Sequence, residues 1–410
     1  MPLFRLLLPV LLIVATQSQA SSSCPGPAQA RPEQTADATT SWATHADAAT
    51  AWPDAQPGLD WLGSTELPTS SLAAARPMTI YTIPVGSGNC QMMLCPSENR
   101  MMMFDCGSTG AGNLGWNRAD VGQFIAANIN DQTAIVVSIS HPDADHSNYL
   151  PDVLAGRPVR AVLVSKHPSD YPAAVVAWMG QLQQDGTTIQ WRNGIYRSQA
   201  PDQYLSCYAP DGQGGWNIDV PGFIVMMNAG ATANDSSMVI AQQYAGFQSL
   251  FTGDMTGATE FQIDPNIPVA LDNTKVITGA HHGAISHGSN SPQWTAANQG
   301  KLVMFSSGTR FHHPRCAAVG NYFPYLFNNA AQHQFQCGDN GQWQTYNTQN
   351  AVYVTNNNGL IRVRVNDQGQ WDYQAAQNAL VHLNAIELQA RDRQHLTTRP
   401  AELDCLGPVN

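Results

Sequence analysis

Two histidines and two aspartates lie within six positions of the segment SISHPDADHSNYL, residues 138–150, directly after the apolar run TAIVV. The four side chains are His141, Asp143, Asp145 and His146. Imidazole and carboxylate groups suit a divalent cation such as Zn²⁺ or Mn²⁺. Pro142 and the small Ala144 permit a tight turn, in which the first His–Asp pair points to one side and the second pair to the other. The segment therefore predicts two half-sites for cations roughly 3.5–4 Å apart.

Three further segments place histidine or aspartate after an apolar, strand-like run. They are FTGDM (251–255), GAHHGAISHG (279–288) and RFHHPRC (310–316). Together with the first segment they hold seven of the twelve histidines, so these residues are concentrated rather than scattered. Asp254 could bridge the two cations, and His281 or His282 would complete the second half-site.

The order of these segments resembles the metallo-β-lactamase superfamily, whose first motif has the form HxHxDH. HPDADH resembles the HxDxDH variant of the hydrolase domain in ComEC-type competence proteins. LFTGDM, HHGAISHGS, NDSSMVI and the pair VGSGNCQMM and MMMFDCGSTG are similar to other motifs of that domain, and HHPR stands where it carries an HP motif. The resemblance covers about residues 78–372.

The resemblance implies an α/β fold, an αββα sandwich of two mixed sheets flanked by helices. It also implies two divalent metal ions, Zn²⁺ or Mn²⁺, and a set of six ligands: His141, Asp143, Asp145, His146, Asp254 and His281. The family's third histidine, between the first motif and the later aspartate, has no clear equivalent. His167 is the only histidine in that interval, and Asn234 or Asp235 could occupy the position instead. A carboxylate in place of an imidazole favours Mn²⁺ more than an all-histidine site would.

The activity that the resemblance implies is hydrolysis of a phosphodiester, as a phosphodiesterase or nuclease, by a metal-activated hydroxide. Asp145 would orient the water, and His313 would donate a proton to the leaving oxygen. Arg315 or Arg310 would clamp a phosphate, and His282 and Asn234 are further candidates for substrate contacts.

Other interpretations of the same residues remain open. HPDADH alone could be an acidic turn that caps a helix, and HHPR could be a solvated loop. The scaffold also suits a lactone or a β-lactam as substrate, or a non-catalytic binding protein. A net charge of −11 and only three lysines oppose tight binding of a nucleic acid, so a nucleotide or small phosphodiester is an alternative substrate.

The chain divides into four parts by composition. Residues 1–20 have a short positive start, an apolar stretch and small residues before a cleavage position, which is typical of a signal peptide, although a retained anchor is the alternative. Residues 21–76 form a low-complexity segment, 77–372 the hydrolase domain, and 373–410 a C-terminal helix and tail. We expect a secreted or periplasmic protein without a membrane span in the mature chain, and the sequence predicts no protein partner.

Eight cysteines in an exported chain predict disulfides. Cys24 could pair with Cys405 and Cys316 with Cys337, while two bridges could join Cys90, Cys95, Cys106 and Cys207. Two hairpins are also predicted. One joins SMVIAQQY to FQSLFTGD around Ala245-Gly246, and the other lies in VYVTNNNGLIRVRV with Asn358-Gly359 at its turn.

Overall fold

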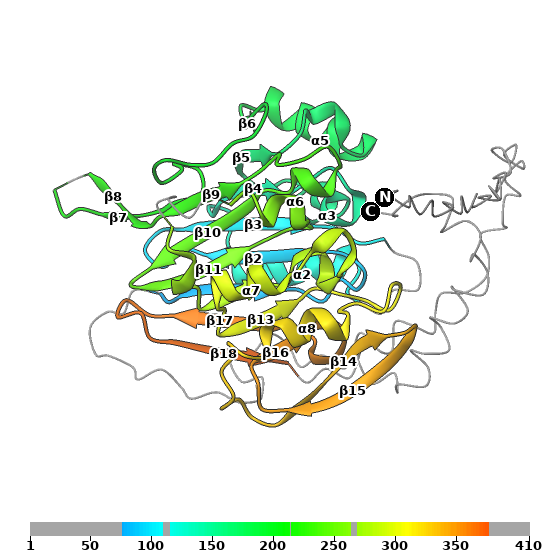
Figure 1. Cartoon of the computed structure of the whole chain (residues 1–410). Coiled ribbons are helices and arrows are strands. Elements are labelled where there is room, and N and C mark those ends of the chain that lie inside the picture. The colour runs from blue at the N-terminus through cyan, green and yellow to red at the C-terminus, as the bar shows by residue number, and fades with distance from the viewer. Residues whose placement is uncertain (1–75, 110–114, 214, 264–268, 377–410) are drawn as a thin grey trace, which may run out of the picture. The chain divides into compact units, whose positions relative to one another are not determined.

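Two large mixed β-sheets are the framework of the protein (Figure 1). The computed structural model describes residues 76–109, 115–213, 215–263 and 269–376. The predicted signal peptide, the pair Cys24 and Cys405, and the C-terminal helix beyond residue 376 lie outside these ranges. β18 ends at Ala375, slightly past the expected domain boundary at residue 372.

The first sheet has eight strands. In spatial order they are β18 (Trp371–Ala375), β17 (Ile361–Val365), β1 (Met78–Thr82), β2 (Cys90–Leu94), β3 (Arg100–Cys106), β4 (Ala134–Ile139), β5 (Val159–Val164) and β6 (Thr188–Trp191). β3 to β6 are parallel, and the other neighbours are antiparallel.

The second sheet has six strands. In spatial order they are β16 (Val352–Val354), β13 (Leu302–Phe305), β12 (Val276–Thr278), β11 (Phe247–Phe251), β10 (Val239–Tyr244) and β9 (Gly222–Met226). β9, β10 and β11 are antiparallel, and β11, β12, β13 and β16 are parallel. Two separate hairpins are β7 (Cys207–Pro210) with β8 (Trp216–Val220), and β14 (His333–Asp339) with β15 (Gln342–Thr348).

Short helices connect the strands. The α-helices are α2 (Arg118–Asn128), α3 (Ala144–Ser147), α4 (Leu150–Val153), α5 (Ala173–Gln184), α6 (Gly257–Glu260), α7 (Pro292–Asn298), α8 (Cys316–Tyr322) and α9 (Thr355–Asn358). Turns of 3₁₀-helix cover Pro168–Asp170, Asn234–Ser236, Leu271–Asn273, Ala280–Gly283 and Ser286–Gly288. Among the described helices, none has the length and apolar character needed to cross a membrane.

Three apolar clusters show that the two sheets are stacked between helical layers. One cluster lies between the sheets, where the rings of Phe104 and Phe251 stack with centroids 3.9 Å apart. A second packs α2, α4 and α5 on the outer face of the first sheet, and a third packs α7 and α8 on the outer face of the second. The predicted fold class, two mixed sheets flanked by helices, is confirmed.

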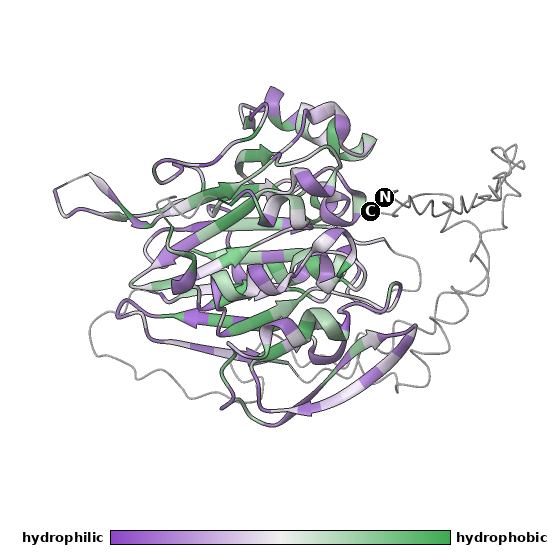
Figure 2. Cartoon of the chain, viewed as in Figure 1, coloured by the Kyte–Doolittle hydropathy of each residue, from purple (hydrophilic) through white to green (hydrophobic). Residues whose placement is uncertain are grey.

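The methionine-rich strands are buried on both faces. Met93 and Met102 point into the cluster between the sheets, whereas Met92, Met101 and Met103 point toward the helices. Successive side chains of a strand alternate between its faces, so a strand covered on both sides is apolar throughout. Figure 2 shows this contrast, with hydrophobic residues in the central strands and a largely hydrophilic β14–β15 hairpin.

One predicted hairpin is confirmed and the other is wrong. β10 and β11 pair around Ala245 and Gly246, both with positive φ. β16 and β17, in contrast, do not pair with each other. β16 pairs with β13 in the second sheet, and β17 pairs with β1 and β18 in the first. The turn between them is the short helix α9, which carries the chain from one sheet to the other.

Candidate metal centre

Strand ends bring the predicted residues together at one edge of both sheets. β4 of the first sheet ends at Ile139, just before His141, and α3 then carries Asp145 and His146. β11 of the second sheet ends three residues before Asp254. The turn Ala280–Gly283, with His281 and His282, follows the neighbouring parallel strand β12. Carboxyl ends of adjacent parallel strands meet at one edge of a sheet, where α/β proteins usually build their sites.

Asp254 is the centre of this cluster. Its side chain is 3% exposed, and Oδ1 lies 3.0 Å from His146 Nε2. Its Oδ2 lies 3.5 Å from His282 Nε2, 3.7 Å from His281 Nε2 and 4.0 Å from His141 Nε2. Four imidazoles from two segments therefore face one buried carboxylate from a third.

Two overlapping groups of side chains have the spacing of metal ligands. One contains His141, His146 and Asp254, and the other contains Asp145, His146 and His282, with the ligand atoms of each group within 4.8 Å of one another. His282 Nε2 lies 3.4 Å from Asp145 Oδ2. His282, which was expected either to contact substrate or to replace His281 in the second half-site, therefore lies among the candidate ligands.

Three of the four imidazoles are oriented by a partner on Nδ1. His146 Nδ1 lies 2.8 Å from Asp105 Oδ2, and His282 Nδ1 lies 2.8 Å from the carbonyl oxygen of Ser306. Ser140 Oγ, 3.0 Å from His141 Nδ1, donates its own proton to Asp105. Each Nδ1 therefore carries a proton, and each Nε2 is directed at the cluster. Metal-binding histidines are oriented in this way by acceptors on their second nitrogen.

The unpaired atoms of the cluster fit bound cations. His141 Nε2 and Asp143 Oδ2 are buried and 3.3 Å apart, yet neither makes a hydrogen bond. Asp143 is the residue before α3, but its carboxylate caps no backbone N–H of that helix. Buried polar atoms without partners are rare in folded proteins. A cation between them would satisfy both, so these residues fit the metal that the sequence implies.

Charge interactions perturb the pKa values of the cluster. Burial opposes the charged form of His146, but the carboxylates of Asp254 and Asp105 hold its pKa well above the usual value. Burial also opposes the charged form of Asp254, yet its histidine neighbours, His146 first, hold its pKa well below the usual value. The side chains of Asp254 and Asp105 are each only 3% exposed. Buried carboxylates of this kind need compensating positive charge, which a bound cation would supply.

Asp105 is a residue of the site that the sequence did not single out. It lies near the end of β3 with φ of 57°, and it accepts hydrogen bonds from Ser140 N, Ser140 Oγ and Asn89 Nδ2. The next residue, Cys106, is bonded to Cys90 of the neighbouring strand. A Cβ on Gly107 would lie 2.6 Å from Ala144 O, so only glycine permits this approach to α3. The signal in the sequence was an aspartate at a strand end followed by Cys-Gly.

The remaining predicted residues are distributed around the cluster. Asn234 is buried, with Nδ2 3.4 Å from His281 Nε2, whereas His167 lies outside the cluster and caps a short turn at the surface. His313 and Arg315 line a pocket of about 370 Å³, and the rings of His313 and His281 are 6.1 Å apart. Burial, and then the cationic neighbours of His313, lower its pKa well below the usual value. At neutral pH its imidazole is therefore uncharged, which counts against the role of proton donor expected from the sequence and suits His313 better as a hydrogen-bond partner of a substrate.

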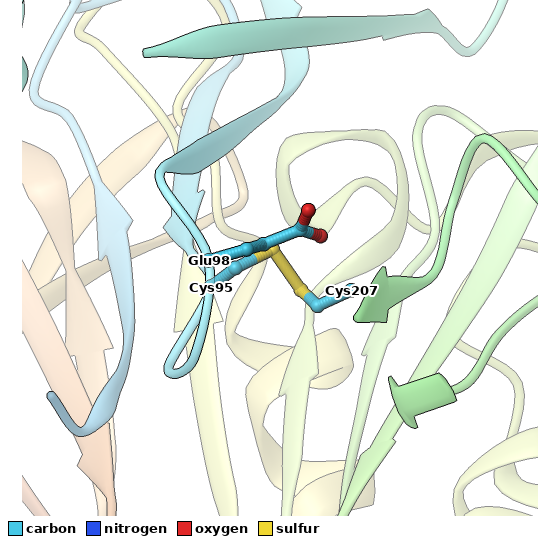
Figure 3. A group of neighbouring side chains, drawn as sticks. All are labelled: Cys95, Glu98 and Cys207. Atoms are coloured by element: carbon cyan, nitrogen blue, oxygen red, sulfur yellow. A yellow bond between two sulfur atoms is a disulfide. The ribbon is translucent and has the colours of Figure 1, made fainter. Parts of the chain in front are cut away.

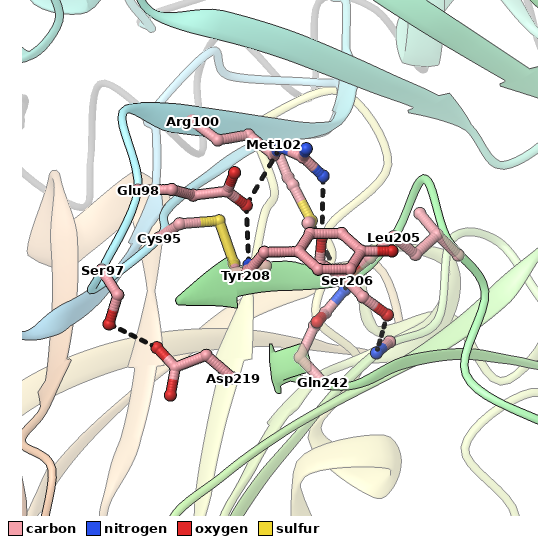
Figure 4. The surroundings of a disulfide bond; sticks show 12 residues. Cys95, Ser97, Glu98, Arg100, Met102, Leu205, Ser206, Tyr208, Asp219 and Gln242 are labelled. Carbon is pink, nitrogen blue, oxygen red and sulfur yellow. Dashed lines mark hydrogen bonds and ion pairs between the residues drawn. A yellow bond between two sulfur atoms is a disulfide. The ribbon is translucent and has the colours of Figure 1, made fainter. Parts of the chain in front are cut away.

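A third group with ligand spacing, Cys95, Glu98 and Cys207, is a structural cross-link (Figure 3). Its two sulfurs are bonded to each other and are not available to a cation. Glu98 accepts a hydrogen bond from Tyr208 N and pairs with Arg100, which reaches Ser206 O (Figure 4). The pair Cys316–Cys337 was predicted and is present. The four cysteines Cys90, Cys95, Cys106 and Cys207 form two bridges as expected.

Comparisons with known proteins give distant similarities to solved structures. No protein-family model matches the sequence, and no curated protein matches it. Among solved structures, the chain is similar to a mutant of CmlA beta-hydroxylase, with 15% identity over 59% of this chain and 47% of that one, and a TM-score of 0.34. It is also similar to a protein of unknown function from Enterococcus faecalis V583, with 12% identity over 44% of each chain and a TM-score of 0.24. The chain thus spans less than half the length of either structure.

Proposed function

We propose that the protein is an exported, dinuclear metal-dependent hydrolase that cleaves phosphodiesters. The observation that carries this proposal is the convergence of His141, His146 and His282 on Asp254, each with Nε2 facing inward. His141, Asp143 and Asp254 would hold one cation. Asp145, His146 and His282 would hold the other, with Asp254 shared and His281 beside it. Disulfides in the described part of the chain support an oxidising compartment, periplasmic or extracellular.

The exposure of the side chains indicates where a substrate would approach. Asp254 is 3% exposed, whereas Asp143 is 20%, Asp145 12% and His282 10% exposed. Two bound cations would activate a water and neutralise charge on the phosphorus oxygens. Asp145, on the more open side, would orient that water. Asp254, the least exposed of these side chains, would keep the two cations in position from the buried side of the site.

The pocket beside the cluster would hold the leaving group. Arg315 on its wall would pair with a phosphate oxygen, and His313, also on the wall, would contact the substrate near the reacting bond. Asn234 does not line this pocket, and its buried amide lies beside His281 instead. A volume of about 370 Å³ is at the small end of ligand pockets. Together with the net charge of −11, this size favours a nucleotide or a small phosphodiester over a nucleic acid polymer.

The proposal is tested with the full-length chain in three assays, each with Mn²⁺ or Zn²⁺. The substrates are bis-p-nitrophenyl phosphate, plasmid DNA and a chromogenic cephalosporin. We expect about two ions per chain and turnover of the first substrate, which Asp145→Ala reduces by at least about 100-fold. Asp185→Ala, at the exposed end of α5, is the matched control and should leave turnover unchanged.

The alternatives give different results in the same assays. If only the cephalosporin is hydrolysed, the substrate is a carboxylic compound such as a β-lactam or lactone and not a phosphodiester. Less than one ion per chain, with no effect of Asp145→Ala, would exclude catalysis and leave a binding protein.

A further inference from the structure

We propose that Asn290 is a positioning residue that sets the orientation of His281 and His282. The effect of Asn290 on cation binding rests on the proposed function. The effect of Asn290 on the orientation of the two imidazoles does not. Asn290 itself is fully buried and lies eight residues beyond His282.

The two histidines have a backbone conformation that they would not adopt alone. His281 has φ 51° and ψ 48°, His282 has φ 54° and ψ 14°, and Gly283 follows with φ 88°. Left-handed conformations are unfavourable for residues with a Cβ, and two in succession persist only where the surroundings impose them. In this conformation both imidazoles face Asp254 Oδ2, although they are adjacent in the chain. Each also has a neighbour of its own, since His281 Nε2 lies near Asn234 and His282 Nε2 near His146.

Asn290 binds the backbone on both sides of this pair. Its Nδ2 donates to Ala280 O at 2.8 Å and Ala284 O at 2.7 Å, and its Oδ1 accepts from Ala280 N at 3.1 Å. Tyr322 OH, at 3.0 Å, donates to the same Oδ1. Both donors and both acceptor positions of the amide are therefore used. An aspartate of the same shape could not make the two donated bonds.

Asn290 is in turn fixed by elements outside the histidine turn. Its backbone N donates to Glu260 Oε1 at 2.7 Å, and its carbonyl oxygen accepts from Asn321 Nδ2 at 2.8 Å. Glu260 ends α6, shortly after Asp254, and Asn321 lies in α8, which begins after Arg315. The Asn290 amide is thus held in place from outside, and its hydrogen bonds to Ala280 and Ala284 fix the backbone of residues 280–284.

The test compares Asn290→Gly with Asn298→Gly in the full-length protein. Glycine accepts the φ of 56° at position 290, so this variant removes the side chain without backbone conflict. Asn298 is an equally buried amide that donates to Trp294 O and accepts from Gly300 N, both near the end of α7. It is a matched control for the loss of a buried amide.

Two readouts distinguish positioning from stability. In the metal-free protein, nitrogen-15 NMR of the imidazoles should show changed signals for His281 and His282 in Asn290→Gly and unchanged ones for His141. Titration with Co²⁺ or Zn²⁺ should show affinity about 10–100-fold weaker for Asn290→Gly. Asn298→Gly should match the wild type in both. The imidazole signals and the cation affinity of Asn290→Asp should lie between those of the two glycine variants. Asn290→Asp takes the place of Asn290→Gly in the test if Asn290→Gly does not fold.

Wild-type imidazole signals in Asn290→Gly, or equal changes in Asn298→Gly, would overturn the proposal. If the wild type binds no divalent cation, the proposed function fails, and the imidazole signals alone still decide the role of Asn290.

Discussion

Asp105 Oδ2 lies 2.8 Å from His146 Nδ1, although 41 positions separate the two residues in the chain. The carboxylate fixes the proton on Nδ1, so that Nε2 of the same ring faces Asp254 Oδ1 at 3.0 Å. Through Ser140, the same carboxylate also orients His141. Asp105, which is not itself a candidate ligand, therefore orients one histidine ring in each of the two half-sites.

This relationship predicts that Asp105→Asn weakens cation binding. An amide nitrogen at this position would oppose the Nδ1 proton of His146 instead of accepting it, and outer partners of this kind contribute about 10–100-fold in metal affinity. Calorimetric titration with Zn²⁺ measures the loss. Asp202→Asn is the control, since Asp202 is a buried aspartate whose partners are Tyr204 N, Leu205 N and Arg192. Equal affinities of the two variants would show that Asp105 does not orient the site.

The two neighbouring histidines are predicted to differ as ligands. His282 Nδ1 is fixed by Ser306 O, whereas His281 Nδ1 is buried without a hydrogen-bond partner. A fixed ring loses less entropy when it binds, so His282→Gln should lower Zn²⁺ affinity more than His281→Gln, by about tenfold. His287→Gln, in the same loop but exposed, should have little effect. The opposite order of the first two variants would make His281 the principal ligand.

The sequence was sufficient to predict most of the histidines and aspartates that gather at the site, because each motif directly follows an apolar strand. His141, Asp145, Asp254 and the 281–282 pair were all expected at strand ends, and the structure brings them to one edge. The type and order of residues are local information, and the covered sheets made the strands readable as continuous apolar runs.

Partner choice and orientation could not be predicted in the same way. Asn358-Gly359 is a strong hairpin signal, yet β17 pairs with β1, far away in the sequence, and β16 with β13. A turn sequence describes the turn and not which sheet each flanking strand joins. Asp105 was overlooked for a related reason. Its role depends on contacts with Asn89, Ser140 and His146 that no spacing reveals.

Cation affinity is predicted to fall as the pH decreases. Burial lowers the pKa values of His146 and His282, but the carboxylate of Asp254 outweighs burial and both pKa values are raised. In the metal-free protein these rings therefore hold protons that a cation must displace, and below the raised pKa values each ion competes with about one or two protons. Zn²⁺ titrations against a chelator between about pH 6 and 8, with proton release measured in buffers of different ionisation enthalpy, test this. Affinity that does not change over this range would contradict the prediction.

Glu260 is predicted to make the metal-free protein less stable as the pH rises from about 4.5 to 7. Burial raises the pKa of Glu260 from 4.5 to about 7, despite hydrogen bonds from Ser291 and Asn290. In this interval the unfolded chain has lost a proton that the folded protein keeps, so the free energy of unfolding falls with rising pH, by up to about 3 kcal/mol. Below pH 4.5 Glu260 is protonated in both the folded and the unfolded chain, so it no longer makes the free energy of unfolding depend on pH. Glu260→Gln cannot titrate, so urea unfolding should show its stability rising relative to wild type across this interval, whereas parallel curves for the two proteins would mean that Glu260 is ionised throughout.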